Sequence, residues 1–131
     1  MDELYKFDIS DNTIKSMIEL VPEIREISED EVIKKELLLK EVGCSDKEIR
    51  NIISSNPYYL VSVNDNIKEL FDYLKKVGFS SLNILFDSNP YILNLEVFEI
   101  SNYIDERNSK GELLSDIIDD LESSPYLFNE I

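Results

Sequence analysis

The chain has 131 residues, of which 28 are acidic and 13 basic, so its formal net charge is −15. Hydrophobic residues make up 43% of the sequence, enough for a continuous core, which excludes an acidic disordered tail. A surface of this sign repels phosphate backbones and anionic membranes and attracts basic partners, although a high net charge also serves solubility alone.

Cysteine content and hydropathy favour a cytoplasmic protein. The single cysteine, Cys44, excludes an internal disulfide and fits a reducing compartment. No apolar run approaches the ~20 residues that a membrane span requires. The acidic start of the chain resembles neither a secretory signal nor an Arg-rich transit peptide.

Four prolines recur at nearly equal intervals. Pro22, Pro57, Pro90 and Pro125 are separated by 35, 33 and 35 residues, and a tyrosine follows each of the last three. A fixed period of this length is typical of stacked helical repeats. Apolar residues stand four and eight positions before each proline, the spacing of one helix face: Ile14 and Ile18, Ile49 and Ile53, Leu82 and Phe86, Ile117 and Leu121.

The first, partial unit covers about residues 10–42. Its first helix should stop near Val21, because proline disfavours the α conformation in the residue before it. Pro22 is then suited to open a short 3₁₀ turn. Ser28 and Glu31 form a capping-box pattern that predicts a second helix from about residue 29 to 42.

The two full units cover about residues 43–77 and 78–108. Each begins with a Gly-X-Ser joint, in which Gly43 or Gly78 fits the left-handed residue after a helix. The serines fit N-caps, and Ser45 with Glu48 predicts a capping box. The helices before the second and third prolines should stop near Asn56 and Asn89.

Further caps and lengths follow from the same reasoning. Ser80 is an expected N-cap, and Asn64 and Asn94 are expected to cap the helices that follow each proline turn. Gly78 precedes Pro90 by only twelve residues, so the first helix of that unit should be short.

A C-terminal capping unit covers about residues 109–131. Ser109 and Glu112 form another capping-box pattern, and the helix they open should stop near Ser124. No segment alternates apolar and polar residues as a strand would. The four units together predict an all-α helical-repeat solenoid that forms a single domain over residues 1–131, each unit having two helices and a Pro-initiated 3₁₀ turn.

Residues 43–60 (GCSDKEIRNIISSNPYYL) and their continuation through residues 68–80 resemble the repeat of the mitochondrial transcription termination factor (mTERF) family. The resemblance is clearest over residues 31–98. It implies a right-angled solenoid whose concave face, lined by Arg and Lys, holds nucleic acid and acts in transcription, replication or ribosome assembly. This chain is acidic, has far fewer repeats and contains only three arginines, so no basic row matches the family's phosphate-binding residues.

Two sets of residues are candidates for binding a protein. Tyr58, Tyr91 and Tyr126 recur at one repeat position and could anchor a partner. The same recurrence also fits half-buried rings that each unit needs for packing. Asp116, Asp119 and Asp120 could receive a basic segment, or form the polar face of a capping helix.

A nucleic-acid interface is the alternative. Its candidate contacts are Lys40, Lys47, Arg50, Lys68 and Lys75, which otherwise form solvated surface paired with acidic neighbours. A third hypothesis is an acidic mimic of nucleic acid that blocks a DNA- or RNA-binding protein.

The sequence contains few of the residues and motifs on which enzyme catalysis commonly depends. There is no histidine, and the three glycines all stand at joints rather than in a phosphate-binding loop. We expect no catalytic residue, cofactor or metal, and expect Cys44 to fill an apolar space beside a turn. The leading hypothesis is therefore a non-catalytic acidic repeat module that binds a basic protein.

Overall fold

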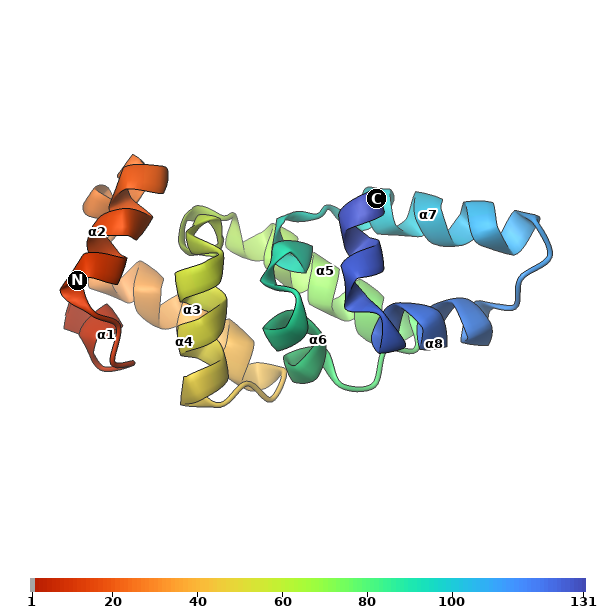
Figure 1. Cartoon of the computed structure of the whole chain (residues 1–131), viewed down its shortest axis with the longest axis horizontal. Helices are drawn as coiled ribbons and strands as arrows, with labels where there is room; N and C mark the ends of the chain where they lie inside the picture. Colours follow the sequence, from red (N-terminus) through yellow and green to blue (C-terminus); the bar gives the residue numbers. More distant parts are fainter. Residues whose placement is uncertain (1) are drawn as a thin grey trace.

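A computed structural model describes residues 2–131, which form α-helices and 3₁₀ helices and, over that range, no strand (Figure 1). The α-helices are α1 (Asp2–Tyr5), α2 (Asp11–Leu20), α3 (Glu29–Glu41), α4 (Asp46–Ser55), α5 (Asn64–Val77), α6 (Leu82–Ser88), α7 (Val97–Ser109) and α8 (Leu114–Ser123). The 3₁₀ helices are η1 (Pro22–Glu26), η2 (Pro57–Val61), η3 (Pro90–Asn94) and η4 (Pro125–Glu130).

A helix, a 3₁₀ helix and a second helix recur as α2–η1–α3, α4–η2–α5 and α6–η3–α7, followed by α8–η4. Equivalent helices stack on one another, α2 on α4 and α4 on α6, with α3, α5 and α7 forming the second row. Figure 1 shows α2, α4 and α6 standing side by side while α3 and α5 run across them. The predicted all-α helical-repeat solenoid is confirmed.

The prolines end the helices as predicted. Val21, Asn56, Asn89 and Ser124 are the C-caps, with φ between −129° and −145° and ψ between 72° and 84°. This near-identical backbone follows from the steric restriction that proline places on the residue before it. The predicted shortness of α6 is also confirmed, at 7 residues against 10 for α4.

Glycine closes the other joints, and serine opens two of the helices as predicted. Gly43 and Gly78 follow α3 and α5 with φ of 96° and 117°, a region that other residues rarely adopt. Ser45 and Glu48 form the predicted capping box. Ser28 accepts a hydrogen bond from the backbone N–H of Glu31 at the start of α3.

Four other predicted caps are wrong. Asn64 is the first residue of α5, Asn94 is the last of η3, and Ser81 rather than Ser80 precedes α6. Ser109 ends α7 instead of opening α8, because the turn through Gly111, whose φ is 98°, delays the next helix to Leu114. The other three side chains do not cap helices because they form hydrogen bonds with residues of other units. Asn64 accepts a hydrogen bond from Lys35, Asn94 accepts one from Asn56, and Ser80 donates to Glu122.

Two asparagine rungs join consecutive units. In the first rung, the side-chain N–H₂ of Asn56 donates to the Pro90 carbonyl and to Asn94 Oδ1, each at 2.9 Å. In the second, Asn89 donates to the Pro125 carbonyl at 2.9 Å and to Asn129 Oδ1 at 3.0 Å. Both donors are buried, so the bonds satisfy amides that would otherwise be costly in the core. The rungs align η2 with η3 and η3 with η4.

Candidate partner-binding groove

A surface groove with a volume of about 730 Å³ lies between the N-terminal parts of α5 and α7. Its floor is apolar and buried, with Ile67, Leu93 and Leu95. The remaining lining residues come from η2 and the joint after it, from α5, from the end of η3 and from the start of α7 with the residue before it: Tyr58, Ser62, Val63, Asn66, Glu69, Asn94, Glu96, Val97, Phe98 and Ser101.

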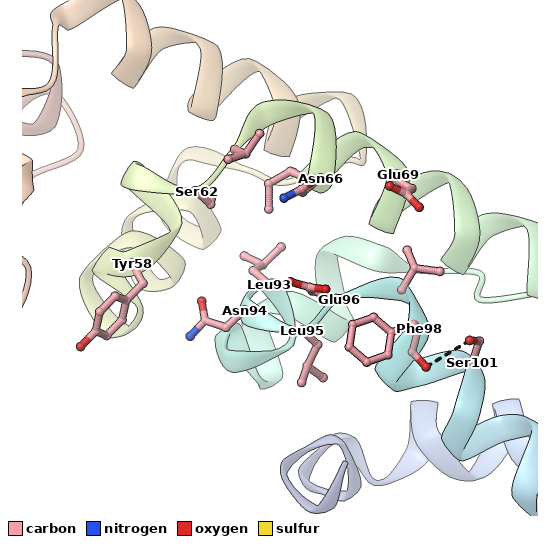
Figure 2. Close-up of a pocket in the computed structure, with 13 residues that line it drawn as sticks. Tyr58, Ser62, Asn66, Glu69, Leu93, Asn94, Leu95, Glu96, Phe98 and Ser101 are labelled. Carbon is pink, nitrogen blue, oxygen red and sulfur yellow. Dashed lines mark hydrogen bonds between the residues drawn. The ribbon is translucent and has the colours of Figure 1, made fainter.

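The aromatic rings of the groove stand at separate positions along it. Figure 2 shows Tyr58 on η2 and Phe98 on α7, with Asn94 and Leu95 between them. Both rings are exposed, Tyr58 by 46% and Phe98 by 58%. Such rings offer large contact areas with little loss of side-chain freedom, which suits anchoring a partner.

The charge of the groove is negative. Glu69 on α5 and Glu96 before α7 are among its lining residues, and no lysine or arginine of residues 2–131 is. Glu96 is the N-cap of α7, and its backbone N–H donates to the Glu99 carboxylate at 3.3 Å. A cation that enters the groove would therefore meet carboxylates at its edge.

The three predicted tyrosine anchors do not lie in one groove. Tyr58 lines the groove, whereas Tyr91 and Tyr126 are 43% and 63% exposed and lie outside it. Their exposure leaves a contact role open for each, and that role stays a prediction.

The acidic cluster of α8 is partly engaged within the chain. Asp116, Asp119 and Asp120 are all exposed, but Asp120 forms an ion pair of 2.9 Å with Arg107. Arg107 also donates two hydrogen bonds to Glu112, at 2.6 and 2.8 Å, and these bonds lower the pKa of Glu112. Asp120 thus helps to fasten α8 to α7, while Asp116 and Asp119 remain on the exposed face.

The five predicted nucleic-acid contacts are distributed over three helices. Lys40 on α3 pairs with Asp46 at 3.7 Å, and Lys68 and Lys75 lie exposed on α5. Lys47 and Arg50 share a second depression, on α4, with three acidic residues: Asp8, Glu48 and Asp87. Three of the five cations therefore lie beside carboxylates, and no groove found within residues 2–131 contains all five. Their role in binding nucleic acid stays a prediction.

A family model for mTERF matches residues 1–104. The chain belongs to the mTERF family. The match confirms the resemblance seen in the repeats, and the mTERF helical solenoid agrees with the architecture of Figure 1. No curated protein matches this mTERF chain.

Residues 2–131 include neither a membrane-spanning helix nor a cluster of metal ligands. None of the helices within residues 2–131 combines the length and the apolar character that crossing a bilayer requires. In the same range, no group of three or more His, Cys, Asp or Glu side chains is arranged to hold a metal ion.

Sequence reasoning missed two buried charged residues of α3. Lys35 is 1% exposed, and its ammonium donates to Asn64 Oδ1 at the start of α5. Burial lowers the pKa of Lys35, because the charged form loses its hydration. Glu36 is 2% exposed and pairs with Lys6 at 2.8 Å, while burial raises its pKa. These residues tie α3 to α5 and to the segment after α1, inside the mTERF stack.

Proposed function

We propose that this mTERF-family chain is a non-catalytic module that binds a basic protein. The observation that carries this proposal is the groove between α5 and α7, which combines exposed aromatic walls with acidic lining residues and includes no cation among the described residues. A sequence without histidine and without a phosphate-binding glycine loop supports a binding role rather than a catalytic one.

Charge supports a protein partner over nucleic acid. The chain carries a net charge of −15, and its C-terminal portion, residues 77–131, has 2 basic residues against 11 acidic ones. Nucleic-acid binding normally requires a basic footprint on the scale of the domain. A negative field steers a basic protein toward the groove and slows the approach of a phosphate backbone.

The experiment is capture on the immobilised chain, with nuclease-treated and untreated lysate in parallel. We expect a basic protein that stays bound after nuclease treatment and elutes as the salt concentration rises, because screening weakens the attraction. In parallel, fluorescence anisotropy measures binding of mixed DNA and RNA at low salt. Tight nucleic-acid binding that Lys68→Glu and Lys75→Glu weaken would overturn the proposal. Competition between DNA and the chain for the captured protein would assign the chain as a mimic.

A further inference from the structure

The groove between α5 and α7 has apolar walls at positions where the fold does not require them. Val63 stands six residues after its proline, where the neighbouring units have Ser28 and Glu96 and the C-terminal unit has Ile131. Phe98 stands eight residues after its proline, where the other units have Asp30 and Asp65. All units share the same backbone at the proline joint, so the repeat itself is compatible with polar residues at both positions.

Exposure strengthens the argument that these two residues serve binding. Val63 is 60% exposed and Phe98 is 58% exposed, so neither contributes a fully buried side chain to the core. A large apolar surface left in water is unfavourable unless a partner covers it. Two such departures from the repeat meet in one groove, with the exposed ring of Tyr58 as a third apolar wall.

The size and polarity of the groove define the occupant. Resting on the proposed function, we propose that the groove binds a short cationic segment of a partner protein, which inserts one bulky apolar side chain between Tyr58 and Phe98 and places Lys or Arg beside Glu69 and Glu96. A volume of about 730 Å³ suits a few side chains rather than a folded domain. The buried floor of Ile67, Leu93 and Leu95 receives the apolar anchor.

Polar side chains in the groove can bind the backbone of such a segment. Asn66 extends from α5 toward the groove, and Asn94 lies between the two rings (Figure 2). The carbonyl oxygen of the Asn94 side chain accepts from Asn56, which fixes the amide in place. Its N–H₂ group can then donate to a peptide carbonyl without losing the rung.

Other occupants fit the groove less well. A phosphate backbone would meet Glu69 and Glu96 without a lining cation. A second copy of the chain would bring a further net charge of −15 against the same carboxylates. A cationic peptide satisfies both the apolar and the acidic features at once.

The test is a nuclear magnetic resonance titration of the ¹⁵N-labelled full chain with three synthetic peptides. The first is a lysine-rich peptide with one central Phe, the second has Ala in place of Phe, and the third has Glu in place of each Lys. We expect the first peptide to shift the backbone amides of Val63, Asn66, Phe98 and Ser101, and the other two to bind at least tenfold more weakly.

Two variants separate the apolar and the charged contributions. Phe98→Ala should weaken binding of the first peptide about fivefold to tenfold, as removal of an aromatic anchor does. Ile84→Ala is the matched control, because Ile84 is 60% exposed on α6 and lies outside the groove. Glu69→Gln should weaken binding at low salt and have little effect at high salt. Unchanged circular dichroism of each variant shows that the fold is retained.

The outcomes distinguish this inference from the proposed function. Shifts confined to α8 around Asp116 and Asp119 would overturn the groove assignment and leave a basic partner in place. Equal binding of the Phe and Ala peptides would overturn the apolar anchor. Absence of shifts with all three peptides would overturn the groove assignment, and failure to capture any basic protein would separately overturn the proposed function.

Discussion

Replacing Asn56 by valine should be among the most damaging substitutions at the repeat joints. Asn56 is 5% exposed and donates two hydrogen bonds of 2.9 Å to the next unit. Each such bond contributes roughly 0.5–1.5 kcal/mol net, and a buried acceptor left without a donor costs roughly a further 1–3 kcal/mol. Because Asn94 is exposed and can turn to water, the partly buried Pro90 carbonyl bears most of this second cost. We expect a loss of about 2–4 kcal/mol in the free energy of unfolding.

The first joint of the stack supplies the reason to test a double variant. Val21 and Val61 occupy the positions that Asn56 and Asn94 hold in the next joint, and both pack in or against the core. An apolar pair can therefore replace a rung. Asn94→Val alone should cost about 1 kcal/mol, and Asn56→Val with Asn94→Val should cost less than the sum of the two single losses, by about 1 kcal/mol.

Urea unfolding followed by far-ultraviolet circular dichroism measures these losses for the wild type, both single variants and the double variant. Ser124→Val is the matched control, because Ser124 stands at the same repeat position but no further unit follows to which it could donate. This substitution should change the free energy of unfolding by no more than about 0.5 kcal/mol. The reasoning fails if Asn56→Val costs no more than the control. Strict additivity of the two single losses would also refute the coupling between the asparagines.

Three further predictions concern other buried or constrained residues. Lys35→Met should raise the free energy of unfolding near neutral pH by about 1 kcal/mol or more, because it removes a buried ammonium that donates to a neutral amide oxygen rather than to a carboxylate. Because folding lowers the pKa of Lys35, the folded wild type loses the proton before the unfolded chain does, and its free energy of unfolding should approach that of the variant as the pH rises toward the ordinary pKa of lysine. A stability difference that stays constant over this pH range would contradict the explanation. Burial, with smaller contributions from Glu48 and Asp87, raises the pKa of Cys44 to about 12, so iodoacetamide at pH 8 should alkylate the native thiol far more slowly than the urea-unfolded one. Gly78→Ala should lower the free energy of unfolding by about 1–2 kcal/mol through its φ of 117° alone, since no atom within 4 Å obstructs a Cβ; a variant as stable as the wild type would show that the turn adjusts.

The sequence was sufficient to predict the features that adjacent residues determine. A proline restricts the residue before it, and a glycine permits a left-handed turn, so the four helix ends before proline and the joints at Gly43 and Gly78 could be placed in advance. The Ser45–Glu48 capping box is equally local, because its two residues stand three apart.

Features that depend on the neighbouring unit could not be placed in the same way. Asn64 and Asn94 have side chains that can cap a helix, but their side-chain oxygens instead accept hydrogen bonds from Lys35 and Asn56 of the preceding unit. Arg107 binds Asp120 across the α7–α8 turn, so an aspartate predicted to face a partner is already paired. These competing bonds arise only when the chain is stacked.

The groove was only partly predictable for a different reason. Tyr58 was recognised because it recurs, yet recurrence marks what every unit needs for folding. Val63 and Phe98 were missed because the neighbouring units have no apolar residue at these positions. Their signal was a departure from the neighbouring units, an apolar residue where those units have a polar one, and it becomes visible only when the units are aligned on their prolines.

Salt dependence by itself does not tell a basic protein from nucleic acid, because both interactions weaken as ions screen the charges. The two kinds of partner are distinguished by whether reversing the charge of one lysine weakens or strengthens binding. Lys68 is exposed on α5 next to Glu69 of the groove. Lys68→Glu should remove a phosphate contact and weaken nucleic-acid binding, but should speed the association of a basic partner through a more negative approach to the groove. Faster association of the captured basic protein with the variant, measured by stopped-flow fluorescence at low salt, would support the groove; slower association would place the contact surface elsewhere.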